Sequence, residues 1–261
     1  MTFEENLEQH LEVLGPVLRS AKKGAAATSR AHKMLGDGDI KGLAKCLEEA
    51  EHELSRAAEG LREFKKQWHD SPIHDYFGSR EYLDELERCL KEAGVDVNRH
   101  DHVLYVYPAI VRVDIEGKAV RIDKKSHTKL RPGKLSRMLY DLQNRPRRFP
   151  TDRFLRSLFK VYKSLASSNL KRSEPWAGKS LYLKDIYNVM SAAPGSDYSE
   201  QEFVRDIYLL DASGESLEVS GHVASFQASS GTRHAGKTLS IITRDGQKKL
   251  YCTIRFDPVG R

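Results

Sequence analysis

Apolar side chains recur at alternating spacings of three and four residues through the first 70 residues. One run comprises Ile40, Leu43, Leu47, Ala50, Leu54, Ala57, Leu61, Phe64 and Trp68. An upstream run comprises Leu7, Leu11, Leu14, Leu18, Ala21, Ala25, Thr28, His32 and Leu35. This period places the apolar positions on one face of a helix. Between the runs, the stretch Gly36-Asp37-Gly38-Asp39 offers a glycine stop, a tight turn and an aspartate N-cap. Residues 1–70 are therefore predicted to form an antiparallel, coiled-coil-like helical hairpin.

The interior of this hairpin is predicted to be rich in alanine. Gly15-Pro16 is expected to kink the first helix, because proline removes a hydrogen bond and clashes with the preceding turn. Two helices alone bury little apolar surface. We therefore expect the hairpin to pack either on the body of its own chain or on a partner chain.

Residues 79–148 combine a helical and an alternating pattern. Residues 70–78 (DSPIHDYFG) interrupt the period and are predicted to be a linker. A short helix is expected between Ser79 and Gly94, followed by the strand-like segments VLYVYP, AIVRVDI and KAVRID, with Glu116-Gly117 as a hairpin turn. A helix is predicted over 133–144. This middle region is thus a helix plus an antiparallel β-hairpin.

Residues 149–261 show three helical patterns before three strand patterns. The helices are expected at 152–167, 180–192 and 200–210, and the strands at about 217–227, 238–244 and 249–256. Three helices followed by a β-hairpin is the order of a winged helix, which is an analogy of fold only. The predicted fold class is α+β and mostly helical, with a hairpin at 1–70, a middle region at 79–148 and a winged-helix-like unit at 149–261.

Charge is distributed unevenly along the chain. Residues 118–173 contain 17 Lys and Arg against three acids, Asp123, Asp141 and Asp152, for a net charge of +14. Since the whole chain carries +6, the remainder carries −8. Such segregation favours one face that contacts a polyanion, with a solvated basic surface as the alternative.

The basic positions form a candidate nucleic-acid surface. On helix 152–167, four of them repeat every three or four residues, opposite the apolar face formed by Phe154, Leu155, Leu158, Tyr162 and Leu165. Contacts of this kind bind phosphates without reading sequence. The full candidate set is Arg121, Lys125, Lys134, Arg137, Arg145, Arg147, Arg148, Arg153, Arg156, Lys160 and Lys163.

The helix predicted at 200–210 is unsuited to DNA. In a winged helix, this third helix would enter the major groove. Here it carries Glu200, Glu202, Asp206 and, at its end, Asp211 against Arg205, so phosphates would repel it. We expect this acidic helix to contact a partner protein instead.

Residues 231–238 match the phosphate-binding pattern G-x-x-x-x-G-K-[ST]. That pattern needs a helix after the threonine, whereas LSIITRDG predicts a strand and a turn. We therefore interpret the stretch as a connection between strands, where a wing tip would lie. Arg233 and Lys237 are its candidates for secondary phosphate contacts.

Catalytic signals are weak. Asp114-x-Glu116-x-Lys118 matches the carboxylate–lysine run of some magnesium nucleases, but it falls on a predicted turn. Cysteines and histidines lack metal-site spacing, so no metal or cofactor is expected. Three widely spaced cysteines fit a reducing cytoplasm. No apolar run approaches the roughly 18 residues that span a bilayer.

The layout resembles accessory subunits of bacterial SMC-type ATPase assemblies, such as those of antiphage and plasmid-elimination systems. The segments that prompt the comparison are RFPTDRFLRSLFKVY (148–162), DYSEQEFVRDIYLLD (197–211) and the heptad hairpin. The resemblance implies helical extensions and winged-helix-like units that dock onto an ATPase. It assigns no site residues.

These patterns together predict a non-catalytic cytoplasmic subunit. Its basic face would hold a nucleic-acid backbone, DNA in the first instance. Its helical surfaces would dock a protein partner, an ATPase or nuclease subunit. A metal-dependent nuclease using Asp114, Glu116 and Lys118, and a purely structural adaptor, are the alternatives.

Overall fold

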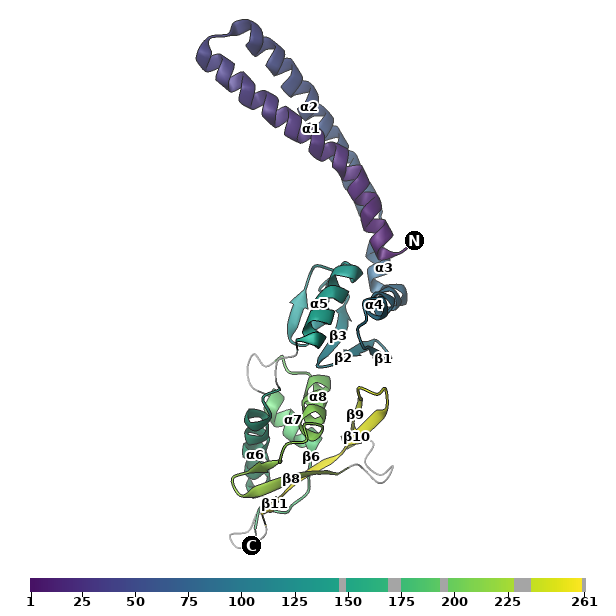
Figure 1. Cartoon of the computed structure of the whole chain (residues 1–261), viewed down its shortest axis with the longest axis vertical. Coiled ribbons are helices and arrows are strands. Elements are labelled where there is room, and N and C mark those ends of the chain that lie inside the picture. Colours follow the sequence, from purple (N-terminus) through teal and green to yellow (C-terminus); the bar gives the residue numbers. More distant parts are fainter. Residues whose placement is uncertain (146–148, 169–174, 193–196, 228–235, 260–261) are drawn as a thin grey trace. The chain divides into compact units, whose positions relative to one another are not determined.

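A computed structural model describes residues 1–145, 149–168, 175–192, 197–227 and 236–259. Internal contacts divide the chain into two units. Unit 1 comprises Met1–Leu86 with Arg131–Gly133, and unit 2 comprises Glu87–Leu130 with Lys134–Arg261. The elements are labelled in Figure 1.

Unit 1 contains the predicted hairpin. Helix α1 (Phe3–Asp37) and helix α2 (Ile40–His69) lie antiparallel side by side (Figure 1). The turn is built as predicted: Gly38 ends α1 with a φ of 71°, and the Asp39 carboxylate accepts the N–H of Gly42 to cap α2. Helix α1 runs through Pro16 without ending there.

The seam of the hairpin is rich in alanine, as predicted, but the predicted leucines are not at its centre. Its buried positions are small, namely Ser20, Gly24, Ala27, Ala31, Cys46, Ala50 and Ala57. The predicted seam residues Leu47, Leu54 and Leu61 are instead 52%, 44% and 54% exposed. Small residues let the two backbones approach closely, so the leucines are displaced to the flank of the seam.

The base of the hairpin is anchored by aromatic packing and one buried carboxylate. Residues 70–78, predicted to be a linker, contain helix α3 (Ile73–Gly78), because Ile73 and Phe77 are buried there. The Phe3 ring lies 6.2 Å from that of Phe77. Glu85, on helix α4 (Arg80–Glu92), accepts the N–H of Phe3 at 2.6 Å. The carboxylate thus satisfies a free donor at the start of α1.

The first part of unit 2 is an antiparallel meander. Strands β1 (Asn98–His100), β2 (Val103–Val106), β3 (Ala109–Asp114), β4 (Ala119–Ile122) and β5 (Lys125–His127) pair in chain order. The predicted hairpin is β3–β4, with Asp114 opposite Ala119. The predicted helix 133–144 is α5 (Pro132–Asn144).

Residues 149–261 begin with helix α6 (Thr151–Ser168), strand β6 (Leu181–Tyr182), helix α7 (Leu183–Ser191) and helix α8 (Glu200–Asp211). The remaining strands are β7 (Glu218–Val219), β8 (His222–Gln227), β9 (Leu239–Ile242), β10 (Lys248–Tyr251) and β11 (Thr253–Pro258). One sheet has the order β6-β11-β8-β7, and β9 pairs with β10. Helix α7 begins later than predicted, since Leu181 pairs with Ile254 in this sheet.

An apolar core in unit 2 joins residues from both parts of its sequence. Side chains of β2 and β3, including Tyr105 and Ile110, join a cluster with α6, α7, α8 and the C-terminal strands. Phe203 and Phe256 lie fully buried in it. The α+β class with several antiparallel sheets is therefore confirmed, whereas the winged-helix arrangement of 149–261 stays a prediction.

Candidate nucleic-acid interface

Helix α6 separates apolar and basic side chains as its sequence predicts. Phe154, Leu155, Leu158 and Tyr162 are buried, and Leu165 is half-buried. Arg153, Arg156, Lys160 and Lys163 are all exposed. The core therefore holds the helix by one face and leaves a row of cations in solvent.

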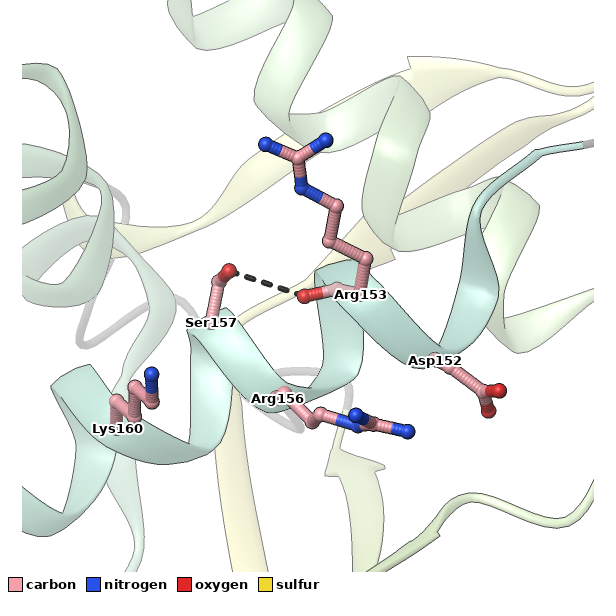
Figure 2. Close-up of a pocket in the computed structure, with 5 residues that line it drawn as sticks. All are labelled: Asp152, Arg153, Arg156, Ser157 and Lys160. Carbon is pink, nitrogen blue, oxygen red and sulfur yellow. Dashed lines mark hydrogen bonds between the residues drawn. The ribbon is translucent and has the colours of Figure 1, made fainter.

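The basic face of α6 lines a shallow depression of about 340 Å³ (Figure 2). The side chains of Arg153, Arg156 and Lys160 border it, together with Asp152 and Ser157. Figure 2 shows the guanidinium groups of Arg153 and Arg156 directed away from each other. Within the described ranges, none of the three cations forms an ion pair, so they are available to an anion.

Lys163 extends this row with a different environment. Its ammonium lies 5.3 Å from the centroid of the Trp176 ring. A cation over an aromatic face is held in place by weak electrostatic attraction. Lys163 therefore has an aromatic neighbour that can orient its ammonium.

Arg153 also borders a larger cleft of about 980 Å³ in unit 2. The apolar lining includes Met138, Leu139, Leu142, Phe149, Phe154, Met190 and Leu209. The basic lining consists of Lys124, Lys125, Arg145, Arg153 and Arg205, with His127 beside them. Three of the predicted residues, Lys125, Arg145 and Arg153, are thereby brought to one cavity.

A buried ion cluster forms part of the wall of this cleft. The Arg205 side chain, only 12% exposed, contacts the carboxylate of Asp123 and lies 2.7 Å from that of Asp206. Tyr198 donates its hydroxyl proton to Asp206 at 2.7 Å. Burial raises the pKa of the Asp123 carboxyl above its usual value, and the Arg205 guanidinium opposes that rise.

The ion cluster affects the net charge that is accessible in the cleft. Arg205 neutralises one of the two charges carried by Asp123 and Asp206, and Glu202 is buried with its carboxylate 3.9 Å from Arg112. Among the described lining residues, Asp141 is the acid left exposed, against Lys124, Lys125, Arg145 and Arg153. The accessible charge of the cleft is therefore mainly positive.

The acidic side chains of helix α8 are engaged in contacts within the chain. Every residue of α8 is buried or half-buried. Asp206 pairs with Arg205, and Asp211 accepts hydrogen bonds from Tyr251 and Lys249 at 2.8 and 2.7 Å. These acids make contacts within the chain, so α8 offers less free acidic surface than its sequence suggests.

The other predicted residues occupy varied places. Arg121 pairs with Asp197. Lys134 and Arg137 are exposed on α5 but lie outside the set that lines the cleft. Arg147, Arg148 and Arg233 fall outside the described residues.

Lys237 makes contacts within the chain. Its ammonium lies 3.7 Å from the Asp185 carboxylate and 4.1 Å from the centroid of the Tyr182 ring. Leu239–Ile242, directly after Thr238, is a strand, as its β-branched residues predict. The helix that a phosphate-binding loop requires at this point is therefore replaced by a strand.

The alternative catalytic run lies at the β3–β4 turn. The Asp114 carboxylate accepts the N–H of Gly117 at 2.9 Å, which is a turn-stabilising contact. Across the described ranges, no group of three or more His, Cys, Asp or Glu side chains is placed to hold a metal ion. In the same ranges, no helix is both long and apolar enough to cross a membrane.

Comparison with family profiles, with curated proteins and with solved structures finds no match to this chain.

Proposed function

We propose that this protein is a non-catalytic subunit that binds the phosphate backbone of nucleic acid, DNA in the first instance, through helix α6 and the basic cleft beside it. The observation that carries the proposal is the row of exposed cations on α6, from Arg153 to Lys163. Arg153 makes the row continuous with the lining of the cleft.

The dimensions of the row suit a polyphosphate. Arg153 and Lys163 are ten residues apart, which corresponds to about 15 Å along a helix. At a rise of 3.4 Å per nucleotide along one DNA strand, that length faces about four phosphates. Phosphate contacts alone give affinity without reading sequence.

The topology supports a winged-helix assignment with an unusual binding face. The order α6-β6-α7-α8-β8-β11, with β11 between β6 and β8 in the sheet, is the order expected of a winged helix, and we interpret β9 and β10 as an extension of the wing. The third helix, α8, is occupied by internal contacts. We therefore assign nucleic-acid contact to the first helix, α6.

Fluorescence anisotropy against a generic duplex over a salt series tests the proposal. Reversing three charges (Arg153→Glu, Arg156→Glu, Lys160→Glu) should weaken binding at least tenfold. It should also make the slope of log K against log salt shallower by about 2.7, at about 0.9 per phosphate contact. The matched control reverses three exposed cations of α1 (Arg19→Glu, Lys22→Glu, Lys33→Glu), with the same change in net charge.

Two results would overturn this proposal. One is the absence of binding by the wild-type protein at low salt. The other is an equal loss of affinity in the α1 control, which would attribute binding to net charge rather than to α6.

We further propose that the protein works in a bacterial, cytoplasmic multiprotein complex, where an SMC-type ATPase of an antiphage system is the partner class. The support is the layout of a long hairpin joined to a basic body, with docking left to helical surfaces other than α8. Co-expression with the ATPase of a neighbouring gene, followed by affinity purification, tests this. Failure of such an ATPase to co-purify would contradict it.

A further inference from the structure

Helix α2 leaves a row of large apolar side chains open to solvent. Ile40, Leu47, Leu54, Leu61 and Trp68 recur every seven residues and are 82%, 52%, 44%, 54% and 38% exposed. In a helix, a seven-residue repeat stays on one face. The row is continuous over 28 residues, or about 42 Å.

The opposite flank of the hairpin seam is polar. Arg30 pairs with Glu49 at 2.7 Å, and Lys23 lies 4.0 Å from Glu53. By helical geometry, Glu49 and Glu53 lie on one side of the seam residues Ala50 and Ala57, and the apolar row lies on the other.

Helix α1 adds to the apolar side of the hairpin. Leu11, Leu18 and Leu35 are 53%, 54% and 65% exposed, on the side of α1 turned away from Lys23 and Arg30. One face of the hairpin thus carries ion pairs, and the other is an apolar stripe that both helices supply.

Charges beside the apolar row are arranged in two halves. Glu48 and Glu51 lie toward the tip of the hairpin, and Arg62 and Lys65 lie toward its base. All four are exposed, and none forms an ion pair with a described residue. Around Leu54, acid and base are therefore separated and unpaired among the described residues, while Lys41 adds a base at the tip.

We infer that the apolar stripe pairs with the same stripe of a second copy of this chain, in antiparallel orientation, to form a four-helix bundle. With the two-fold axis at Leu54, Leu47 of one chain meets Leu61 of the other. Glu48 of each chain then lies beside Arg62 of the other chain, so the two-fold axis generates two equivalent pairs. A parallel pairing would instead place Glu48 against Glu48, which is repulsive.

The size of the stripe is adequate for a stable dimer. Two helices side by side, each about 10 Å wide and about 42 Å long, present about 800 Å². Standard protein interfaces bury about 800 Å² per partner. This inference goes beyond the proposed function and is independent of phosphate binding, because its experiments contain no nucleic acid.

The mass of the full chain in solution, measured by light scattering after size exclusion, tests the pairing. At a concentration on the order of 10 µM, the wild-type protein should have twice the mass of one chain. The variant Leu47→Lys with Leu61→Lys should be monomeric while its far-ultraviolet circular dichroism stays helical. Leu250→Lys, which replaces an apolar side chain 40% exposed on β10, is the matched control and should remain dimeric.

Charge reversal and cysteine cross-linking test the register. Glu48→Lys should raise the dimer dissociation constant about tenfold, because two rim pairs turn from attractive to repulsive. Adding Arg62→Glu to this variant should restore the dissociation constant of the wild-type protein. Under mild oxidation, the Leu54→Cys variant should form a disulfide between the two chains. The variant Leu47→Cys alone should form none, whereas the double variant Leu47→Cys with Leu61→Cys should form one.

Three outcomes would overturn the inference. If the wild-type protein is monomeric, the stripe does not bind a second copy of this chain. A dimer that survives Leu47→Lys with Leu61→Lys would use another surface. Efficient cross-linking of Leu47→Cys alone would indicate a parallel pair.

Discussion

Arg205 is the side chain on which the ion cluster of unit 2 depends. It is 12% exposed and contacts Asp123 and Asp206, which are 33% and 14% exposed. Removing the cation would leave two largely desolvated carboxylates without compensation. Loss of one partner from a buried pair costs far more than the pair itself contributes.

We expect Arg205→Met to lower the free energy of unfolding by about 3–5 kcal/mol, measured by urea denaturation. Arg255→Met is the matched control, since Arg255 is 41% exposed and pairs with Asp257 at 2.8 Å. An exposed pair of this kind contributes at most about 1 kcal/mol. Equal losses in the two variants would show that burial of the cluster contributes nothing.

Local patterns predict the charged residues of α6 but not the cluster around Arg205. The spacing of Arg153, Arg156 and Lys160 places them on one helical face wherever the helix packs. Asp123 and Arg205 are 82 positions apart, and nothing in either segment points to the other. Tertiary packing alone brings them together, and it turns α8 from an apparent docking surface into an internal element.

At the scale of the element, the hairpin seam depends on glycine as well as alanine. A Cβ atom at Gly24 would lie 2.7 Å from Cγ of Leu54 and 3.2 Å from its backbone nitrogen. One of these neighbours is main chain, which cannot be moved without separating the helices. Close approach of α1 and α2 therefore requires the absence of a side chain at this position.

Gly24→Ala and Gly36→Ala should change stability in opposite directions. Alanine favours helix over glycine by about 1 kcal/mol. At Gly36, where a Cβ would meet nothing within 4 Å, that gain should raise the thermal midpoint. At Gly24, overpacking of about 1–3 kcal/mol should cancel or reverse the gain. Circular dichroism melts of both variants measure this, and a higher midpoint for Gly24→Ala would contradict the close approach.

Periodicity predicts most elements but not which side of a helix is buried. The spacing of three and four locates α1 and α2 well, because it depends only on helical geometry. The same spacing cannot distinguish a seam of Ala50 and Ala57 from one that includes Leu47 and Leu54. Helix α3 was unpredictable for a similar reason: Ile73 and Phe77 gain their helical conformation from burial against Phe3 and Tyr82.

At the scale of the whole molecule, buried tyrosines make the stability of unit 2 depend on pH. Burial raises the pKa values of Tyr107, Tyr198 and Tyr251 well above the ordinary value of about 10. Tyr107 and Tyr251 also donate hydrogen bonds, to the Ile242 carbonyl and the Asp211 carboxylate. Above pH 10 the unfolded chain loses phenol protons that the folded chain keeps.

The stability that these tyrosines contribute is therefore fully present below about pH 10 and is lost as pH rises through the folded pKa values. We expect the free energy of unfolding to fall by about 1.4 kcal/mol per pH unit for each buried phenol. Guanidinium denaturation at several pH values from 9 to 11, as rough bounds, measures the slope. Tyr198→Phe should make the slope shallower, and Tyr140→Phe, at an exposed position, is the matched control. Phenolate absorbance from all 11 tyrosines in a still-folded protein would contradict this account.

Residues 1–70 are synthesised before α6, and the contacts between α1 and α2 lie within those residues. A helical pair of this kind forms within microseconds to milliseconds. Synthesis of residues 71–168, to the end of α6, takes roughly 5 to 20 s at 5–20 residues per second. During that interval the apolar stripe is complete while α6 is not yet made. Two nascent chains translated from the same messenger RNA would therefore pair before α6 of either chain can bind a phosphate. Assembly would then precede nucleic-acid binding.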